Sequence, residues 1–126
     1  MSVAKASIYS LHQSSRKVAI VLDLIRGKKV EEAYRILAFV RRQAAESVLK
    51  LLRSAVANAN QKGEYKPESL FVSKAYANQG LSFRKVEPKA MSRHGIQKSR
   101  TSHVSIELDV NEGAKPKQAK AEGVKK

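Results

Sequence analysis

The densest concentration of positive charge in the chain lies in residues 82–103. One residue of this segment, Glu87, is acidic, and six are basic: Arg84, Lys85, Lys89, Arg93, Lys98 and Arg100. Lysine and arginine bind phosphate through charge-assisted hydrogen bonds and release the counterions that surround a nucleic acid. Large apolar residues are sparse here, so the segment has little core of its own to bury. The pattern indicates a surface that binds a polyanion.

We expect this segment to form a two-stranded ribbon. It lies between two predicted strands, and residues 91–95 are typical of a turn at its midpoint. Arms of about ten residues, at about 3.3 Å per residue, would reach roughly 30–35 Å. An isolated ribbon is marginal in water, and this one repels itself, so it should become ordered when RNA neutralises it. The alternative is a long solvated loop, although such loops are uncommon in small domains.

Two further groups of basic residues lie at the ends of a predicted helix. Arg16 and Lys17 follow Ser14 at the start of the helix, where free amide groups attract phosphate. An equally good interpretation is a serine cap followed by two solvated cations. Arg26 and Lys28 lie at the other end of this helix, where complementing the helix dipole is the simpler explanation of their charge.

The sequence offers no catalytic or metal-binding arrangement. The three histidines, His12, His94 and His103, lack metal-ligand spacing, and there is no cysteine. No nucleophile elbow is present, and Gly27-Lys28 lacks the earlier glycine and the following hydroxyl residue of a phosphate loop. We therefore expect neither an enzyme nor a cofactor. His103 begins the predicted last strand and is interpreted as a packing or phosphate-contact residue.

The elements that must position these residues follow from the spacing of apolar side chains. Repeats of three or four predict helices over residues 14–27, 30–40 and 42–62. Alternation with a period of two predicts strands over residues 69–77 and 104–108, and a further short strand is predicted over residues 4–11. These elements predict an α+β domain, with three helices packed on one face of a small three-stranded sheet. The ribbon would protrude from it as a long β-hairpin.

Length and composition set the outer limits. The 126 residues suffice for one domain, predicted over residues 1–110 with the hairpin at about 82–103. Residues 111–126 are predicted to form a disordered basic tail. Lys and Arg number 25 against 11 Asp and Glu, and the resulting net charge of +14 favours a nucleic acid or an anionic membrane as partner. The longest apolar run, residues 18–22, is far short of the roughly 20 that span a bilayer. The apolar stripes of the predicted helices are needed for the core, so we expect no membrane association.

Five blocks of sequence, in one order across residues 4–110, carry a family resemblance. The blocks are Ser14-x-Arg16-Lys17-Val18, Asp23 to Ala33, Ser54 to Ala59, Leu70 to Ser73, and Pro88-Lys89-Ala90 continuing to Lys98-x-Arg100-Thr101-Ser102-His103-Val104. In these blocks the chain resembles the bacterial large-ribosomal-subunit protein twenty-two family.

The resemblance implies a structural protein that binds 23S-type rRNA, bridges several rRNA domains during early subunit assembly, and lines the nascent-peptide exit tunnel with its hairpin. It implies neighbouring large-subunit proteins and the nascent peptide as partners, a cytoplasmic location in the ribosome, and no homo-oligomer. The residues implied to bind rRNA are Arg16, Lys17, Arg26, Lys28, Arg84, Lys85, Lys89, Arg93, Lys98, Arg100, Thr101 and His103. Those implied to line the tunnel at the hairpin tip are Lys89, Ala90, Met91, Ser92, Arg93, His94 and Gly95.

The chain departs from the family pattern at three positions. The family often has proline where this chain has Ser15, and arginine and glycine where it has Met91 and Ser92. From the residues alone, two other functions stay open. An architectural DNA-binding protein fits the size and charge, and a small enzyme is the other class, although the sequence offers it no site.

Overall fold

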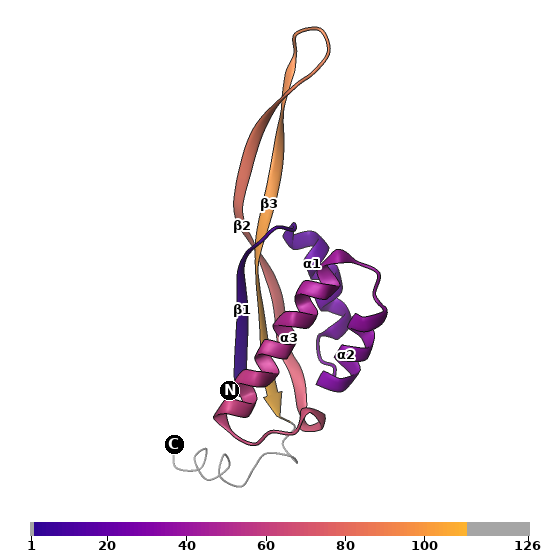
Figure 1. Cartoon of the computed structure of the whole chain (residues 1–126), viewed down its shortest axis with the longest axis vertical. Helices are drawn as coiled ribbons and strands as arrows, with labels where there is room; N and C mark the ends of the chain where they lie inside the picture. The colour runs from indigo at the N-terminus through magenta and orange to yellow at the C-terminus, as the bar shows by residue number, and fades with distance from the viewer. Residues whose placement is uncertain (1, 111–126) are drawn as a thin grey trace.

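The structure is a computed structural model in which residues 2–110 are described, so the predicted tail lies outside the described residues. The elements along the chain are β1 (Ala4–Leu11), α1 (Ser15–Ile25), α2 (Val30–Phe39), α3 (Gln43–Lys62), a short 3-10 helix η1 (Pro67–Ser69), β2 (Leu70–Pro88) and β3 (His94–Val110). The strands form one antiparallel sheet in the order β1-β3-β2. The helices pack beside one part of the sheet, and β2 and β3 continue far beyond them (Figure 1). The predicted α+β fold with a long hairpin is confirmed.

Local sequence explains where α1 begins and ends. The Ser14 hydroxyl accepts a hydrogen bond of 3.4 Å from the amide of Lys17, which caps the helix. After the helix, Gly27 adopts a φ of 78°, a conformation that side chains with a Cβ disfavour. The Gly27 amide then donates to the carbonyl oxygen of Val72, 2.9 Å away, and this bond ties the end of α1 to β2.

The core lies between the helices and one face of the sheet. Val104, Ile106 and Leu108 alternate along β3 and are at most 1% exposed, whereas Glu107 points to the opposite face. Leu52 of α3 is fully buried in the same core cluster. Burying a side chain of this size contributes about 1.5–3 kcal/mol, so this layer anchors the sheet to the helices.

The strands β2 and β3 are longer than the sequence predicts. Apart from Ser69, which belongs to η1, the predicted strands over residues 69–77 and 104–108 are the parts of β2 and β3 that the helices cover. Each strand runs unbroken into the ribbon. The prediction that His103 begins the last strand is therefore wrong, because His103 lies in the middle of β3. Apolar alternation ends where the helices no longer cover the sheet, although backbone pairing continues.

The junction between body and ribbon, which we call the root, contains two irregularities in strand pairing. The register shifts in β2 between Gln79 and Ser82, and in β1 between Ile8 and Leu11, and both shifts lie next to Ser102 of β3. Each places one extra residue opposite β3, which bends a strand locally. The strand β1 ends at the root, so the ribbon beyond it is two-stranded.

Candidate RNA interface

The ribbon consists of seven consecutive residue pairs, from Ser82 opposite Arg100 to Pro88 opposite His94. At about 3.3 Å per residue these pairs span roughly 20–25 Å. That is shorter than the 30–35 Å expected from the sequence, because residues 89–93 form the turn and residues 101–103 belong to the sheet of the body. Its residues are mostly exposed, so the predicted ribbon exists and presents its side chains to the surroundings.

Basic side chains lie on both faces of the ribbon. Because β3 has no extra residue, Lys98 and Arg100 continue the row of Val104 that faces the helices. Arg84, which pairs with Lys98, lies on this helix side. Lys85 pairs with Gln97 and lies on the opposite face. The ribbon can therefore contact phosphates on two sides at once.

The charges of the ribbon are poorly compensated within the chain. Among the described residues, the only ion pair made by residues 82–103 joins Lys89 Nζ to Glu87 Oε2, at 3.3 Å. Exposed pairs of this kind contribute at most about 1 kcal/mol, and Lys89 can exchange the carboxylate for a phosphate at little cost. The other basic side chains of the ribbon have no carboxylate within 4 Å in this part of the structure.

The tip is a tight turn. The amide of Arg93 donates a hydrogen bond of 3.3 Å to the carbonyl oxygen of Ala90. The amide of Lys89 donates one of 2.7 Å to the carbonyl oxygen of Arg93. Between them, Met91 and Ser92 have positive φ values of 58° and 59°. These left-handed conformations are typical of a type I′ hairpin turn, in which glycine or asparagine is preferred.

The structure changes the boundary of the predicted tip. His94 and Gly95 belong to β3 and pair with Pro88 and Glu87, so the turn itself covers residues 89–93. Met91, at the end of the turn farthest from the body, is 90% exposed. Whether these residues line a tunnel stays a prediction.

Two residues of the predicted rRNA-binding set make contacts within the root. Thr101 is 2% exposed, and its hydroxyl donates a hydrogen bond of 2.6 Å to the carbonyl oxygen of Leu81. His103 Nδ1 accepts from the amide of Ser10 at 3.1 Å, and its ring lies edge-on to Tyr9 with centroids 5.4 Å apart. The structure therefore gives both residues a packing role, and their contact with rRNA stays a prediction.

Arg26 and Lys28 lie at the far end of α1 from the root. The Arg26 guanidinium donates to the carbonyl oxygen of Ala75, at 2.7 and 3.2 Å, and to Asp23 at 2.6 Å. Lys28 Nζ lies 3.3 Å from a carboxylate oxygen of Glu32. These contacts occupy both cations within the chain, and their predicted role in rRNA binding is likewise untested.

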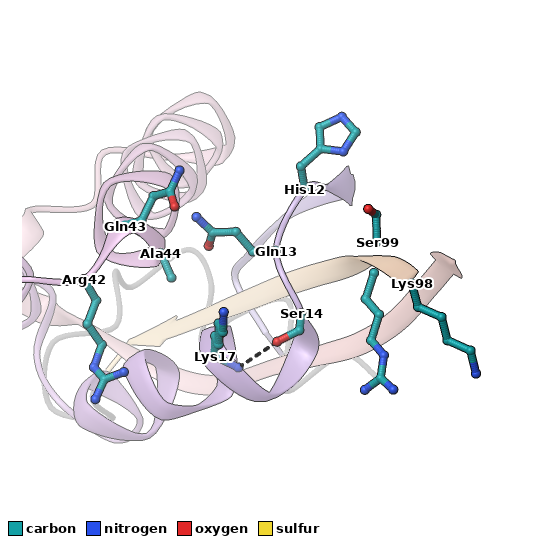
Figure 2. Close-up of a pocket in the computed structure, with 10 residues that line it drawn as sticks. His12, Gln13, Ser14, Lys17, Arg42, Gln43, Ala44, Lys98 and Ser99 are labelled. Carbon is teal, nitrogen blue, oxygen red and sulfur yellow. Dashed lines mark hydrogen bonds between the residues drawn. The ribbon is translucent and has the colours of Figure 1, made fainter. Parts of the chain in front are cut away.

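Three of the predicted basic residues line a hollow of about 770 Å³ between the body and the ribbon, which we call the corner hollow. Its walls come from the β1–α1 connection, the starts of α1 and α3, and β3 (Figure 2). The predicted residues that line the hollow are Lys17, Lys98 and Arg100. Arg16, which precedes Lys17 in the sequence, is exposed but does not line the hollow. No carboxylate lines the corner hollow.

The sequence interpretation missed Arg42, which also lines the corner hollow. Arg42 is the N-cap residue of α3, and no side chain caps this helix. The sequence contains a signal for this residue, because Arg41 and Arg42 are two adjacent basic residues at the start of a predicted helix, like Arg16 and Lys17. Only the fold shows that the start of α3 lies near the ribbon.

The described residues show neither a metal site nor a membrane span. Across residues 2–110, no three His, Cys, Asp or Glu side chains are grouped so that they could hold a metal ion. No helix in the same range has the length and apolar character needed to cross a membrane.

Comparison with known proteins identifies the family. Residues 6–109 match the family described as "Ribosomal protein L22p/L17e". The chain belongs to this family. The L22p/L17e family consists of structural proteins of the ribosome, not enzymes.

Individual relatives are similar to this chain over most of their length, and each is named "Large ribosomal subunit protein uL22". The relative from Desulforamulus reducens is 44% identical over 111 residues, which cover 87% of this chain and 98% of the relative. The relative from Clostridium tetani is 46% identical over 103 residues, covering 82% and 93%. The relative from Latilactobacillus sakei is 42% identical over 109 residues, covering 86% and 93%.

Proposed function

We propose that the chain is a structural component of the large ribosomal subunit that binds 23S-type rRNA through its ribbon and root. The observation that carries this proposal is the projecting ribbon, whose cations are exposed on both faces and, apart from Lys89, lack carboxylate partners among the described residues. The names of the relatives support the same conclusion, because they place those proteins in the large ribosomal subunit.

The mechanism is electrostatic and geometric. Phosphates replace water and counterions around Lys85 on one face of the ribbon and Arg84 and Lys98 on the other. Because the two faces point in opposite directions, one ribbon can hold two RNA segments that would otherwise repel each other. This is how we expect the chain to bridge rRNA domains during early subunit assembly.

A salt titration tests this function. If about 6–10 phosphates are contacted, affinity for large-subunit rRNA falls by roughly 10³–10⁵ between 50 and 200 mM salt, on the scale of duplex DNA. Competition with duplex DNA of equal length distinguishes an architectural DNA-binding protein, which would prefer the duplex. A flat salt response, or preference for DNA, would contradict rRNA binding.

We also infer that the tip, residues 89–93, lines the nascent-peptide exit tunnel, with neighbouring large-subunit proteins around it. The exposure of Met91 and the length of the ribbon support this inference, because they give the tip a reach well beyond the body. A photoreactive residue at Met91, in assembled ribosomes carrying a stalled nascent chain, should crosslink to that chain. The same residue at Asn60, on the exposed side of α3, should not, and equal crosslinking at both positions would exclude a specific tunnel contact.

A further inference from the structure

The corner hollow separates two pairs of cations that belong to different parts of the molecule. Lys17 and Arg42 project from the body, and Lys98 and Arg100 project from the ribbon. No carboxylate lies in the lining between them. Like charges on the two walls repel each other, and this repulsion is strongest at low salt, where screening is weak.

Two helices begin at the same hollow. Ser14 caps α1 with its side chain, whereas α3 begins at Arg42 without a side-chain cap. The first amide groups of a helix carry a partial positive charge and bind phosphate readily. These amides add to the four cations and favour an anionic occupant.

The size of the hollow indicates what kind of anion fits. A volume of about 770 Å³ lies within the range of about 300–1,000 Å³ typical of pockets for sizeable ligands. A single phosphate leaves most of this space empty, whereas a stretch of phosphodiester backbone fills it.

The sheet narrows from three strands to two at the joint beside the hollow. Beyond Leu11 the sheet loses β1, and the ribbon continues with two strands past the paired register shifts at the root. Two-stranded ribbons are more strongly twisted than wider sheets and are only marginally stable by themselves. The direction of the ribbon is therefore sensitive to whatever occupies the corner hollow.

We propose that the corner hollow binds the phosphodiester backbone of one RNA segment that passes from the body to the ribbon, and that this segment fixes the direction of the ribbon. The proposal rests on the rRNA-binding function above and adds a site and a consequence to it. When phosphates occupy the hollow, the cations of both walls are attracted to the same anion, which outweighs their repulsion of each other.

The first test measures the direction of the ribbon in the full-length chain with pyrophosphate as the probe. The natural chain has no cysteine, so Ser54→Cys and Ala90→Cys introduce two unique spin-label positions, on α3 and at the tip. Pulsed electron resonance should show a broad distance distribution at low salt that narrows with pyrophosphate but not with chloride of equal ionic strength. An unchanged distribution would overturn the proposal.

A matched pair of charge variants shows where pyrophosphate acts. In Lys17→Gln/Arg42→Gln the narrowing should disappear. In Lys62→Gln/Lys66→Gln, which removes the same charge at the other end of α3, it should persist. Equal responses of the two double variants would overturn the proposal. The wild-type response is informative even if one variant unfolds.

The second test uses rRNA and separates this inference from the proposed function. For Lys17→Gln/Arg42→Gln, the slope of log affinity against log salt should decrease by about 2, one for each lost phosphate contact. The slope of Lys62→Gln/Lys66→Gln should stay at the wild-type value. If the wild type binds rRNA and the two slopes are equal, only the corner hollow is excluded as a site. If the wild type does not bind rRNA, the proposed function itself fails.

Discussion

Arg84 and Lys98 lie directly opposite each other in the ribbon, so two cations share one cross-strand pair. Like charges in this position destabilise a pair of strands, whereas opposite charges stabilise it by about 0.2–1 kcal/mol. Neither cation has a carboxylate within 4 Å among the described residues. The ribbon therefore carries a built-in repulsion that an RNA phosphate near both side chains would remove.

Lys98→Glu should separate the stability of the ribbon from its binding. The introduced carboxylate lies opposite Arg84 and replaces repulsion with attraction, so amide hydrogens near positions 84 and 98 should exchange more slowly in the free chain. Affinity for large-subunit rRNA should fall roughly tenfold or more, because a charged hydrogen bond contributes about 1.5–3 kcal/mol and a new anion repels phosphate. Lys62→Glu, at the end of α3, is the control for net charge. Faster exchange together with weaker binding would contradict this account.

Binding should order the ribbon. In the free chain, amides of residues 84–100 should exchange quickly, because a two-stranded ribbon is only marginally stable. In the rRNA complex they should exchange slowly, while buried amides of α3 stay protected in both states. Hydrogen–deuterium exchange read by mass spectrometry measures both regions in one experiment. Equal protection of the ribbon in both states would show that it is rigid without RNA.

Gly80→Ala should destabilise the root. A Cβ at this position would lie 2.6 Å from Thr101 Oγ1 and 3.2 Å from the ring of His103. The Thr101 hydroxyl is buried and hydrogen-bonded to Leu81, so it cannot move aside freely. We expect the free energy of unfolding to fall by about 1–3 kcal/mol, as in other overpacked sites, measured by denaturant titration. Gly95→Ala is the matched control, because its Cβ would meet only the flexible Lys89 side chain, at 3.4 Å.

Ser92→Gly should stabilise the tip. Ser92 has a φ of 59°, a conformation that costs a residue with a Cβ about 1–2 kcal/mol and that glycine adopts freely. The amides of Lys89 and Arg93, which close the turn, should therefore exchange more slowly. Ser99→Gly, within β3, should act in the opposite direction because glycine weakens a strand interior. A faster exchange in Ser92→Gly would indicate that the turn adopts another conformation in solution.

Alkaline pH should weaken the body through Tyr34. Burial raises the pKa of the Tyr34 phenol above its usual 10.0, against a smaller opposing effect of Arg53. The folded chain therefore holds this proton more tightly than the unfolded chain, and the resulting stability is present below pH 10 and lost as pH rises through the folded pKa. The difference in unfolding free energy between wild type and Tyr34→Phe should shrink or reverse as the pH rises above 10. A difference that does not depend on pH would contradict the raised pKa.

Most of the body could be predicted from periodicity. Val18, Val21 and Leu22 are spaced for one helical face, and the structure buries all three. Alternation around Ile106 predicted a strand whose other face is polar, and this is confirmed. These elements are predictable because the pattern of burial repeats with the period of the element itself.

The root and the corner hollow depend on the three-dimensional fold. Arg42 lines the hollow with Lys98, although 56 positions separate them in the chain, and no local pattern connects the two. Thr101 continues a basic stretch in the sequence, yet the extra residue in β2 lets its hydroxyl reach Leu81 and buries it. The bulge between Gln79 and Ser82 decides which of these side chains stay accessible.

The order of the strands in the sheet has a consequence for folding during translation. The strand β3 is central and is the last of the three to be synthesised, so neither β1 nor β2 has its partner until residues 94–110 have been made. At about 5–20 residues per second, β1 waits of the order of ten seconds for its neighbour. During translation the three helices are complete while both outer strands are still single, so a chaperone that shields β1 in this interval would protect the newly made chain from pairing with the wrong strand.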